Sequence, residues 1–147
     1  MTMLKDILQL AAQRAAAKGL PYAGELTPQE AFEALQQGAA VLVDVRSGAE
    51  LELVGRVPNA NHIEWAFYPG MVANADFASQ LQAQVDKSQA IVFMCRTGGR
   101  SHNAAVVAEE LGYIAYNMLE GFEGVANEQK QRTLINGWKH AGLPWGN

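Results

Sequence analysis

The chain alternates between short, continuous apolar runs and segments whose apolar residues recur at helical spacing. The two strongest apolar runs cover residues 40–45 and 90–94, and such runs are typical of strands buried on both faces of a sheet. Weaker strand signals cover residues 61–64 and 113–119. Buried strands that alternate with helices predict an α/β fold with a mostly parallel sheet.

Two of the expected helices have strong start signals. Thr27–Glu30 and Ser47–Glu50 both have the pattern of a capping box, in which a hydroxyl and a carboxylate each bind a free backbone N–H group of the first turn. We therefore expect one helix to run from the first box to about Gly38, and a shorter helix to run from the second box to about Gly55.

Other helices follow from spacing alone. Apolar residues four positions apart predict a helix over residues 76–85, and a further helix should follow the 90–94 strand and end at Gly112. Residues 121–147 are polar and interrupted by glycines, so the pattern is weakest there. We predict only one short helix in that segment, near Leu134 to His140.

The first 20 residues predict an amphipathic helix. We expect it to be an extension, over residues 1–20, of a single domain over residues 21–147. It should pack on that domain or on a second copy in a homodimer. Membrane-surface binding is the weaker alternative, because the apolar face has small alanines and no aromatic residue. That face is formed by Leu4, Ile7, Leu8, Ala11, Ala12 and Ala15.

Composition narrows the class of protein. Of the 147 residues, 49% are hydrophobic and 18% are charged, which predicts a soluble, cytoplasmic domain with its own core. No apolar run approaches the roughly 20 residues of a membrane helix, and the N-terminus lacks the pattern of a signal peptide. The net charge of −4 argues against a nucleic-acid or anionic-membrane partner. One cysteine and three scattered histidines predict no disulfide, no metal and no cofactor.

The candidate chemistry lies directly after the strand at residues 90–94. Cys95 stands at the carboxyl end of that strand, where α/β folds bind their ligands. Glycines allow the backbone N–H groups of the loop to converge, and the following helix N-terminus adds positive charge to that of Arg96 and Arg100. These features favour the nucleophilic thiolate and an anionic substrate. The alternative is an inert buried cysteine, but arginines rarely stand at a buried strand end without an anion.

Four segments of the chain carry motifs in a recognisable order. They are Cys95–Ser101, Val43–Arg46 with Glu50, Gly55–Ala60, and Gly137–Trp138 with Ala141–Pro144. They resemble motifs of the rhodanese-type sulfurtransferases. Cys95–Ser101 resembles the active-site loop, and Val43–Arg46 with Glu50 resembles the first signature. Gly55–Ala60 resembles the Gly-His-Ile-Pro-Gly-Ala segment, and the C-terminal residues resemble the closing motif. The resemblance spans about Glu25 to Trp145.

The resemblance implies a rhodanese-like fold: a central parallel sheet of about five strands with helices on both faces. It also implies that Cys95 attacks a small anionic sulfur donor such as thiosulfate, holds the sulfur as a persulfide and passes it to cyanide or a thiol. Asp44 and Arg46 either support this loop or form a purely structural ion pair. The residues implied to bind the substrate are Arg96, Thr97, Gly98, Gly99, Arg100 and Ser101.

Departures from the family pattern define the alternatives. Arg56 replaces the usual histidine, Asn59 replaces a glycine, and a polar insertion after Leu119 either lines the pocket or forms a surface loop. Related phosphatases and arsenate reductases have an arginine six positions after the cysteine, but that position here is Ser101. The shorter loop suits a single sulfur better than a phosphate. A binding or sulfur-relay module without thiosulfate turnover is the remaining alternative.

Overall fold

A five-stranded parallel sheet forms the centre of the protein. Its strands are β1 (Gly24–Leu26), β2 (Val41–Asp44), β3 (Asn61–His62), β6 (Ile91–Met94) and β7 (Ala115–Met118). Their spatial order is β1-β7-β6-β2-β3, and every neighbouring pair is parallel. The computed structural model describes residues 3–147, so the first two residues of the predicted extension lie outside the described part. The predicted α/β class and parallel sheet are confirmed.

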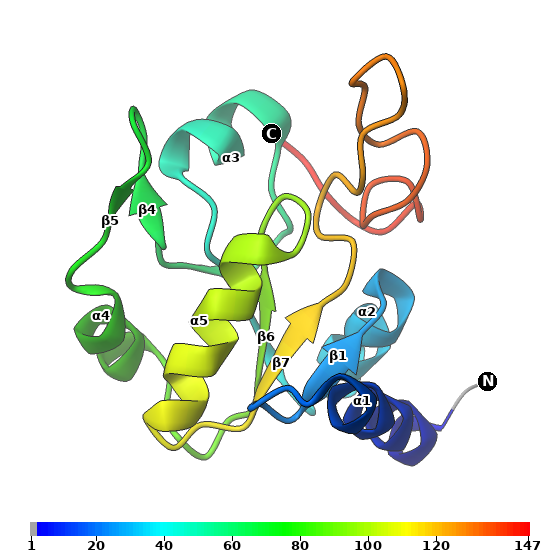
Figure 1. The fold of residues 1–147 in the computed structure, drawn as a ribbon, viewed down its shortest axis with the longest axis vertical. Coiled ribbons are helices and arrows are strands. Elements are labelled where there is room, and N and C mark those ends of the chain that lie inside the picture. The colour runs from blue at the N-terminus through cyan, green and yellow to red at the C-terminus, as the bar shows by residue number, and fades with distance from the viewer. Residues whose placement is uncertain (1–2) are drawn as a thin grey trace.

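Helices cover both faces of this sheet, as expected. They are α1 (Leu4–Lys18), α2 (Pro28–Gln36), α3 (Gly48–Val54), α4 (Phe77–Gln84) and α5 (Gly99–Glu110). Buried residues of α1 and α2 pack on one face, and buried residues of α4 and α5 pack on the other. In Figure 1, α5 runs beside β6 and β7, and α3 lies beyond the carboxyl end of the sheet.

The local signals for α2 and α3 are confirmed at the level of single hydrogen bonds. Thr27 Oγ1 accepts from the Glu30 N–H at 3.3 Å, and Glu30 Oε1 accepts from the Thr27 N–H at 2.9 Å. Ser47 and Glu50 make the same reciprocal pair at 3.4 and 3.2 Å. Both predicted capping boxes are therefore present, and both helices begin where the sequence places them.

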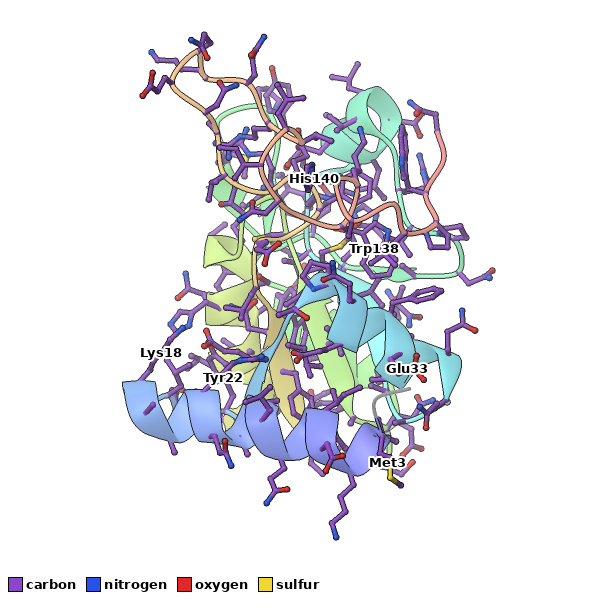
Figure 2. The ribbon with its side chains drawn as sticks, turned by 90° about the vertical axis from the view of Figure 1, so that its right-hand side faces the viewer. Met3, Lys18, Tyr22, Glu33, Trp138 and His140 are labelled. Carbon is purple, nitrogen blue, oxygen red and sulfur yellow. The ribbon has the colours of Figure 1, made fainter. Side chains whose placement is uncertain are left out.

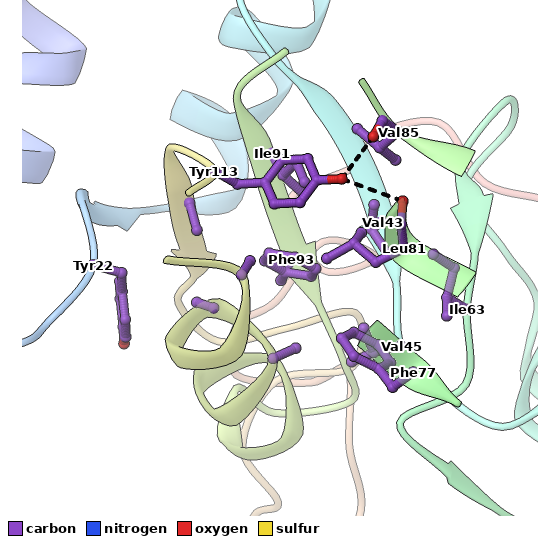
Figure 3. Packing of buried hydrophobic residues seen from close by; sticks show 14 of the residues in the cluster. Tyr22, Val43, Val45, Ile63, Phe77, Leu81, Val85, Ile91, Phe93 and Tyr113 are labelled. Atoms are coloured by element: carbon purple, nitrogen blue, oxygen red, sulfur yellow. Dashed lines mark hydrogen bonds between the residues drawn. The ribbon is translucent and has the colours of Figure 1, made fainter. Parts of the chain in front are cut away.

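The core between the sheet and α4–α5 is closely packed (Figure 3). Val43 and Phe93 from adjacent strands contact the apolar side of α4, represented by Leu81. The Tyr113 hydroxyl donates to the Val85 carbonyl at 2.7 Å, which satisfies a polar group inside this core. The strands β2 and β6 thus lie between two apolar layers, which is why their sequences are almost continuously hydrophobic.

The N-terminal helix packs on its own domain (Figure 2). Ile7, Ala11 and Ala15 of its apolar face are buried, while Ala12 is exposed. The helix lies against β1, where a Cβ atom on Gly24 would lie 2.6 Å from the Ala11 carbonyl carbon. Arg14 pairs with both carboxylate oxygens of Glu30, at 2.6 and 3.1 Å. The first of the two predicted placements is therefore observed, and the homodimer stays a prediction. No helix within residues 3–147 combines the length and the apolar character needed to cross a membrane.

Three short elements differ from the sequence prediction. The strand β1 and an antiparallel hairpin of β4 (Ala66–Phe67) and β5 (Val72–Ala73) were not expected. The helix predicted near Leu134 to His140 is wrong, because that segment forms bends and turns. Gly137 there has a φ of 107°, which no right-handed helix contains. Residues 121–147 instead cross the carboxyl end of the sheet and end beside α3, where Gly146 pairs with Arg56 (Figure 1).

Candidate functional site

The Cys95 loop occupies the carboxyl end of the central strand. Cys95 follows β6 directly, and α5 begins four residues later at Gly99. The thiol is free, and the residue is only 1% exposed. Arg96 and Thr97, which follow it, are exposed on the surface. The predicted strand–cysteine–helix arrangement is thus present, with the sulfur at the base of the loop and polar side chains around its opening.

Two groups lie within hydrogen-bond distance of the sulfur. The Gly98 N–H donates to Cys95 Sγ at 3.1 Å, and Ser101 Oγ lies 3.3 Å from the same atom. Gly98 has a φ of 115°, a left-handed conformation that glycine adopts without strain and that turns its N–H inward. The glycine at this position therefore has a direct function, because it supplies the one backbone N–H within residues 3–147 that donates to the sulfur.

The segment after β7 fixes the orientation of the loop. Phe122 N–H donates to the Cys95 carbonyl at 2.9 Å, and Glu123 N–H donates to the Arg96 carbonyl at 3.1 Å. Gly121 makes this contact feasible, because a Cβ atom there would lie 2.5 Å from the Arg96 carbonyl. Because this segment binds both carbonyl groups, the N–H groups of the loop can point away from it and bind a ligand. Those without a hydrogen-bond acceptor within residues 3–147 belong to Arg96, Thr97, Gly99, Arg100 and Ser101.

Arg100 is held by a carboxylate from α3. Its terminal nitrogens lie 2.6 and 2.9 Å from the two oxygens of Glu50, and both side chains are about one-fifth exposed, at 20% and 21%. Burial acts to raise the pKa of Glu50, but the hydrogen bonds and charge of Arg100 and the Ser47 cap outweigh it and lower the pKa to about 2. The hydrogen bond to Glu50 raises the pKa of Arg100. Glu50 thus links the first signature to the loop, a contact that the sequence interpretation missed.

Asp44 and Arg46 form a buried ion pair beside the loop. Arg46 Nη2 lies 2.7 Å from Asp44 Oδ2 and donates to the Gly55 carbonyl at 3.0 Å. Its guanidinium carbon lies 4.1 Å from the centre of the Phe122 ring. Arg46 is 0% exposed, and its Nη1 atom has no hydrogen-bond partner within residues 3–147. The pair is structural in its contacts, and Arg46 packs on Phe122, whose N–H group holds the Cys95 carbonyl.

Two further polar residues lie beside the loop. Asn117, which the sequence interpretation did not single out, accepts from Ser101 Oγ at 2.6 Å and donates to the Gly98 carbonyl at 3.2 Å. Its signal was a lone amide in an otherwise apolar strand. His102 lies 2.7 Å from the Tyr22 hydroxyl through Nδ1. No three His, Cys, Asp or Glu side chains in the described part of the chain are placed to hold a metal ion.

The chain is similar to known proteins over most of its length. Residues 27–128 match the family model of the rhodanese-like domain. The chain is 38% identical over 109 residues to the uncharacterized protein RC0915 of Rickettsia conorii, covering 72% of this chain and 82% of that protein. It is 34% identical over 101 residues to the thiosulfate sulfurtransferase GlpE of Haemophilus influenzae, covering 68% and 85%. The crystal structure of Rv0390 from M. tuberculosis superposes with a TM-score of 0.78 at 38% identity, covering 85% and 98%.

Proposed function

Because this chain belongs to the rhodanese-like domain family, we propose that it is a sulfurtransferase that carries a sulfur atom on Cys95 as a persulfide. The observation that supports this best is the surroundings of the sulfur. One backbone N–H donates to it, and further N–H groups without an acceptor within residues 3–147 follow at the start of α5. The charge of Arg100 is paired with Glu50, so the backbone N–H groups supply most of the positive field. This environment is small, and it favours an anion centred on one sulfur atom.

The first half-reaction loads the cysteine. The Cys95 thiolate attacks the outer sulfur of a donor such as thiosulfate, the bond between the two donor sulfurs breaks, and sulfite leaves with the electron pair. The transferred sulfur remains as the terminal, negatively charged atom of a Cys95 persulfide. The N–H groups of the loop stabilise that charge. Arg96, which is exposed and makes no ion pair within residues 3–147, attracts the oxygens of the donor.

The second half-reaction needs an acceptor from outside the chain. Cys95 is the only cysteine among the 147 residues, so no second thiol within them can resolve the persulfide. Cyanide would take the terminal sulfur as thiocyanate and restore the Cys95 thiolate. An external thiolate would take it as its own persulfide. The same chemistry serves a sulfur relay, in which a cellular thiol replaces cyanide. The single cysteine supports both candidates equally, because each of them needs an acceptor from outside the chain.

The first experiment is intact mass spectrometry of the protein after incubation with thiosulfate. We expect a gain of one sulfur atom, loss of that gain after cyanide is added, and no gain in Cys95→Ser. Loading without cyanide turnover would support the relay instead. If neither thiosulfate nor inorganic polysulfide adds sulfur to Cys95, the proposed function is wrong.

A second experiment tests donor binding by Arg96. Arg96→Gln should require more thiosulfate for half-maximal loading, because it removes the exposed positive charge at the opening of the loop. Arg56→Gln is the matched control, since Arg56 is also a partly exposed arginine but pairs with Glu52 on α3. Equal thiosulfate requirements in both variants would show that Arg96 does not bind the donor.

A further inference from the structure

The last three residues, 145–147, form a C-terminal strap that lies against the end of α3 (Figure 1). The backbone of Gly146 exchanges two hydrogen bonds with that of Arg56, at 2.7 and 2.9 Å. Gly55 leaves room for the Trp145 ring, because a Cβ atom there would lie 2.6 Å from a ring carbon. The residue is still 42% exposed, so one part of the indole is packed and the rest faces solvent. The sulfur-transfer steps provide no role for this ring.

The side chain of Lys139 connects the Trp145 ring to the interior. Its ammonium nitrogen lies 3.9 Å from the centre of the Trp145 ring and 5.6 Å from the centre of the Phe122 ring. It also donates to the Val54 carbonyl, at the C-terminal end of α3, at 3.3 Å. Lys139 makes no ion pair with a carboxylate within residues 3–147. The two rings and the helix carbonyl therefore stabilise its charge.

Phe122 carries this contact to the Cys95 loop. Its ring meets the Trp145 ring edge to face, with 6.2 Å between the ring centres and 90° between the ring planes. Its backbone N–H donates to the Cys95 carbonyl at 2.9 Å. That carbonyl shares one rigid trans peptide unit with the Arg96 N–H, so the two groups point in opposite directions. The hydrogen bond from Phe122 thus fixes the direction of an N–H group that has no acceptor within residues 3–147.

We infer that Trp145 is a positioning residue for the Cys95 loop. It acts through Lys139 and Phe122, which together hold the Cys95 carbonyl in place. The inference rests on the proposed function, because the groups that are positioned are those that bind the donor and the transferred sulfur. Without the indole, Lys139 loses the nearer of its two rings and Phe122 loses its edge contact. The hydrogen bond to the Cys95 carbonyl then opens more often, and the loop N–H groups point less often towards the sulfur donor.

The first test follows sulfur loading by intact mass at increasing thiosulfate concentrations. A small misplacement of catalytic groups slows a reaction strongly, so Trp145→Ala should lower the loading rate at saturating thiosulfate about tenfold. The thiosulfate concentration for the half-maximal rate should change less than about twofold, because the Arg96 side chain is untouched. Trp145→Phe keeps an aromatic face for Lys139 and should restore most of the rate. If Trp145→Phe loads as slowly as Trp145→Ala, the assignment is wrong.

Lys139→Met tests the route by which the ring acts. Methionine keeps an apolar stem between the two rings but removes the cation. Because Lys139 and Trp145 belong to one contact, the double variant should slow loading by less than the product of the two single effects. Effects that multiply fully would show that the two residues act independently, and would overturn this route.

Gly24→Ala is the control for lost stability. It crowds Ala11 of α1, and neither residue contacts the C-terminal strap or the Cys95 loop. Gly24→Ala should lower the urea midpoint and load sulfur at the wild-type rate. If it slows loading as much as Trp145→Ala, lost stability alone accounts for the effect and the assignment fails.

Amide hydrogen exchange, read by nuclear magnetic resonance, tests the positioning without a sulfur donor. Trp145→Ala should speed exchange of the Phe122 N–H about tenfold, because its hydrogen bond opens more often. The Val45 N–H, which donates to the Met94 carbonyl at 2.9 Å, is the internal reference and should keep its rate. Unchanged exchange at Phe122, or equal acceleration at both amides, would overturn the assignment.

The two measurements also separate this inference from the proposed function. If Phe122 responds as expected but the wild-type protein takes no sulfur from thiosulfate or inorganic polysulfide, the proposed function fails and the positioning of the Cys95 carbonyl by Trp145 stands. If the wild-type protein loads sulfur and Trp145→Ala loads it at the same rate, the proposed function stands and the role of Trp145 fails.

Discussion

The ion pair between Glu50 and Arg100 gives the sharpest prediction about stability. Glu50→Gln keeps the size of the side chain, and glutamine can also complete the capping box at the start of α3. The substitution removes the negative charge that faces Arg100 at 2.6 and 2.9 Å. It therefore isolates the charge from the cap.

The magnitude follows from the pKa of Glu50. Burial acts to raise this pKa, but Arg100 and the Ser47 cap outweigh burial and lower it from 4.5 to about 2. At about 1.4 kcal/mol for each pKa unit, this corresponds to at most about 3.5 kcal/mol. Both side chains are about one-fifth exposed, so solvent screening reduces our expectation to about 1–2 kcal/mol. Because the pKa of the folded state is the lower one, this contribution is complete above about pH 4.5 and is lost as the pH falls towards 2.

The assay is urea unfolding of wild type and Glu50→Gln at several pH values between 2 and 7. The difference in the free energy of unfolding should be about 1–2 kcal/mol at pH 7 and should shrink towards zero as the pH approaches 2. Glu52→Gln is the control on the same helix, because its pair with Arg56 is far more exposed, and it should change stability by less than about 1 kcal/mol. A difference for Glu50→Gln that is the same at pH 2 and pH 7 would refute the reasoning.

Three further substitutions test the packing around the loop and beneath α1. Gly121→Ala should lower the free energy of unfolding by about 1–3 kcal/mol, because Gly121 has a φ of 70°. It should also reduce thiosulfate loading, because the new methyl group would lie 2.5 Å from the Arg96 carbonyl. Unchanged unfolding and loading would contradict this. Phe122→Ala removes a fully buried ring that has the cations of Arg46 and Lys139 near it, and urea unfolding should show a loss of about 3–5 kcal/mol rather than a neutral change. Gly24→Ala should lower the urea midpoint by displacing α1, since its Cβ would lie 2.6 Å from Ala11; a wild-type midpoint would show that the helix is not seated there.

Much of the fold could be predicted because its main elements have strong local signals. Residues 41–44 and 91–94 are buried on both faces, so their continuous apolar character identifies them as strands. The capping boxes fix the starts of α2 and α3 through hydrogen bonds made within three residues. The hairpin of β4 and β5 has two residues in each strand, which is too short for any periodicity. The helix expected near Leu134 fails because packing against distant segments fixes backbone angles there that local sequence does not specify.

Part of the candidate site could likewise be predicted from the sequence, and part could not. The loop from Cys95 to Ser101 is contiguous in sequence, so its cysteine, glycines and arginines could be identified together. Glu50 lies fifty residues before Arg100, and its capping pattern already explained its presence, so the ion pair could not be predicted from spacing. Asn117 reaches the loop only because β7 lies beside β6.

The depth of Cys95 has a consequence for which molecules can exchange sulfur with it. The α-carbons of two cysteines joined by a disulfide stand about 4.4–6.8 Å apart, so a flat protein surface cannot bring its own backbone that close to a residue that is 1% exposed. Two copies of the folded chain are therefore protected from becoming cross-linked through this thiol in air. An acceptor thiolate attacks the outer sulfur of the persulfide rather than Cys95 itself, and we expect the depth of the loop to favour an acceptor that is small or stands on a narrow projection.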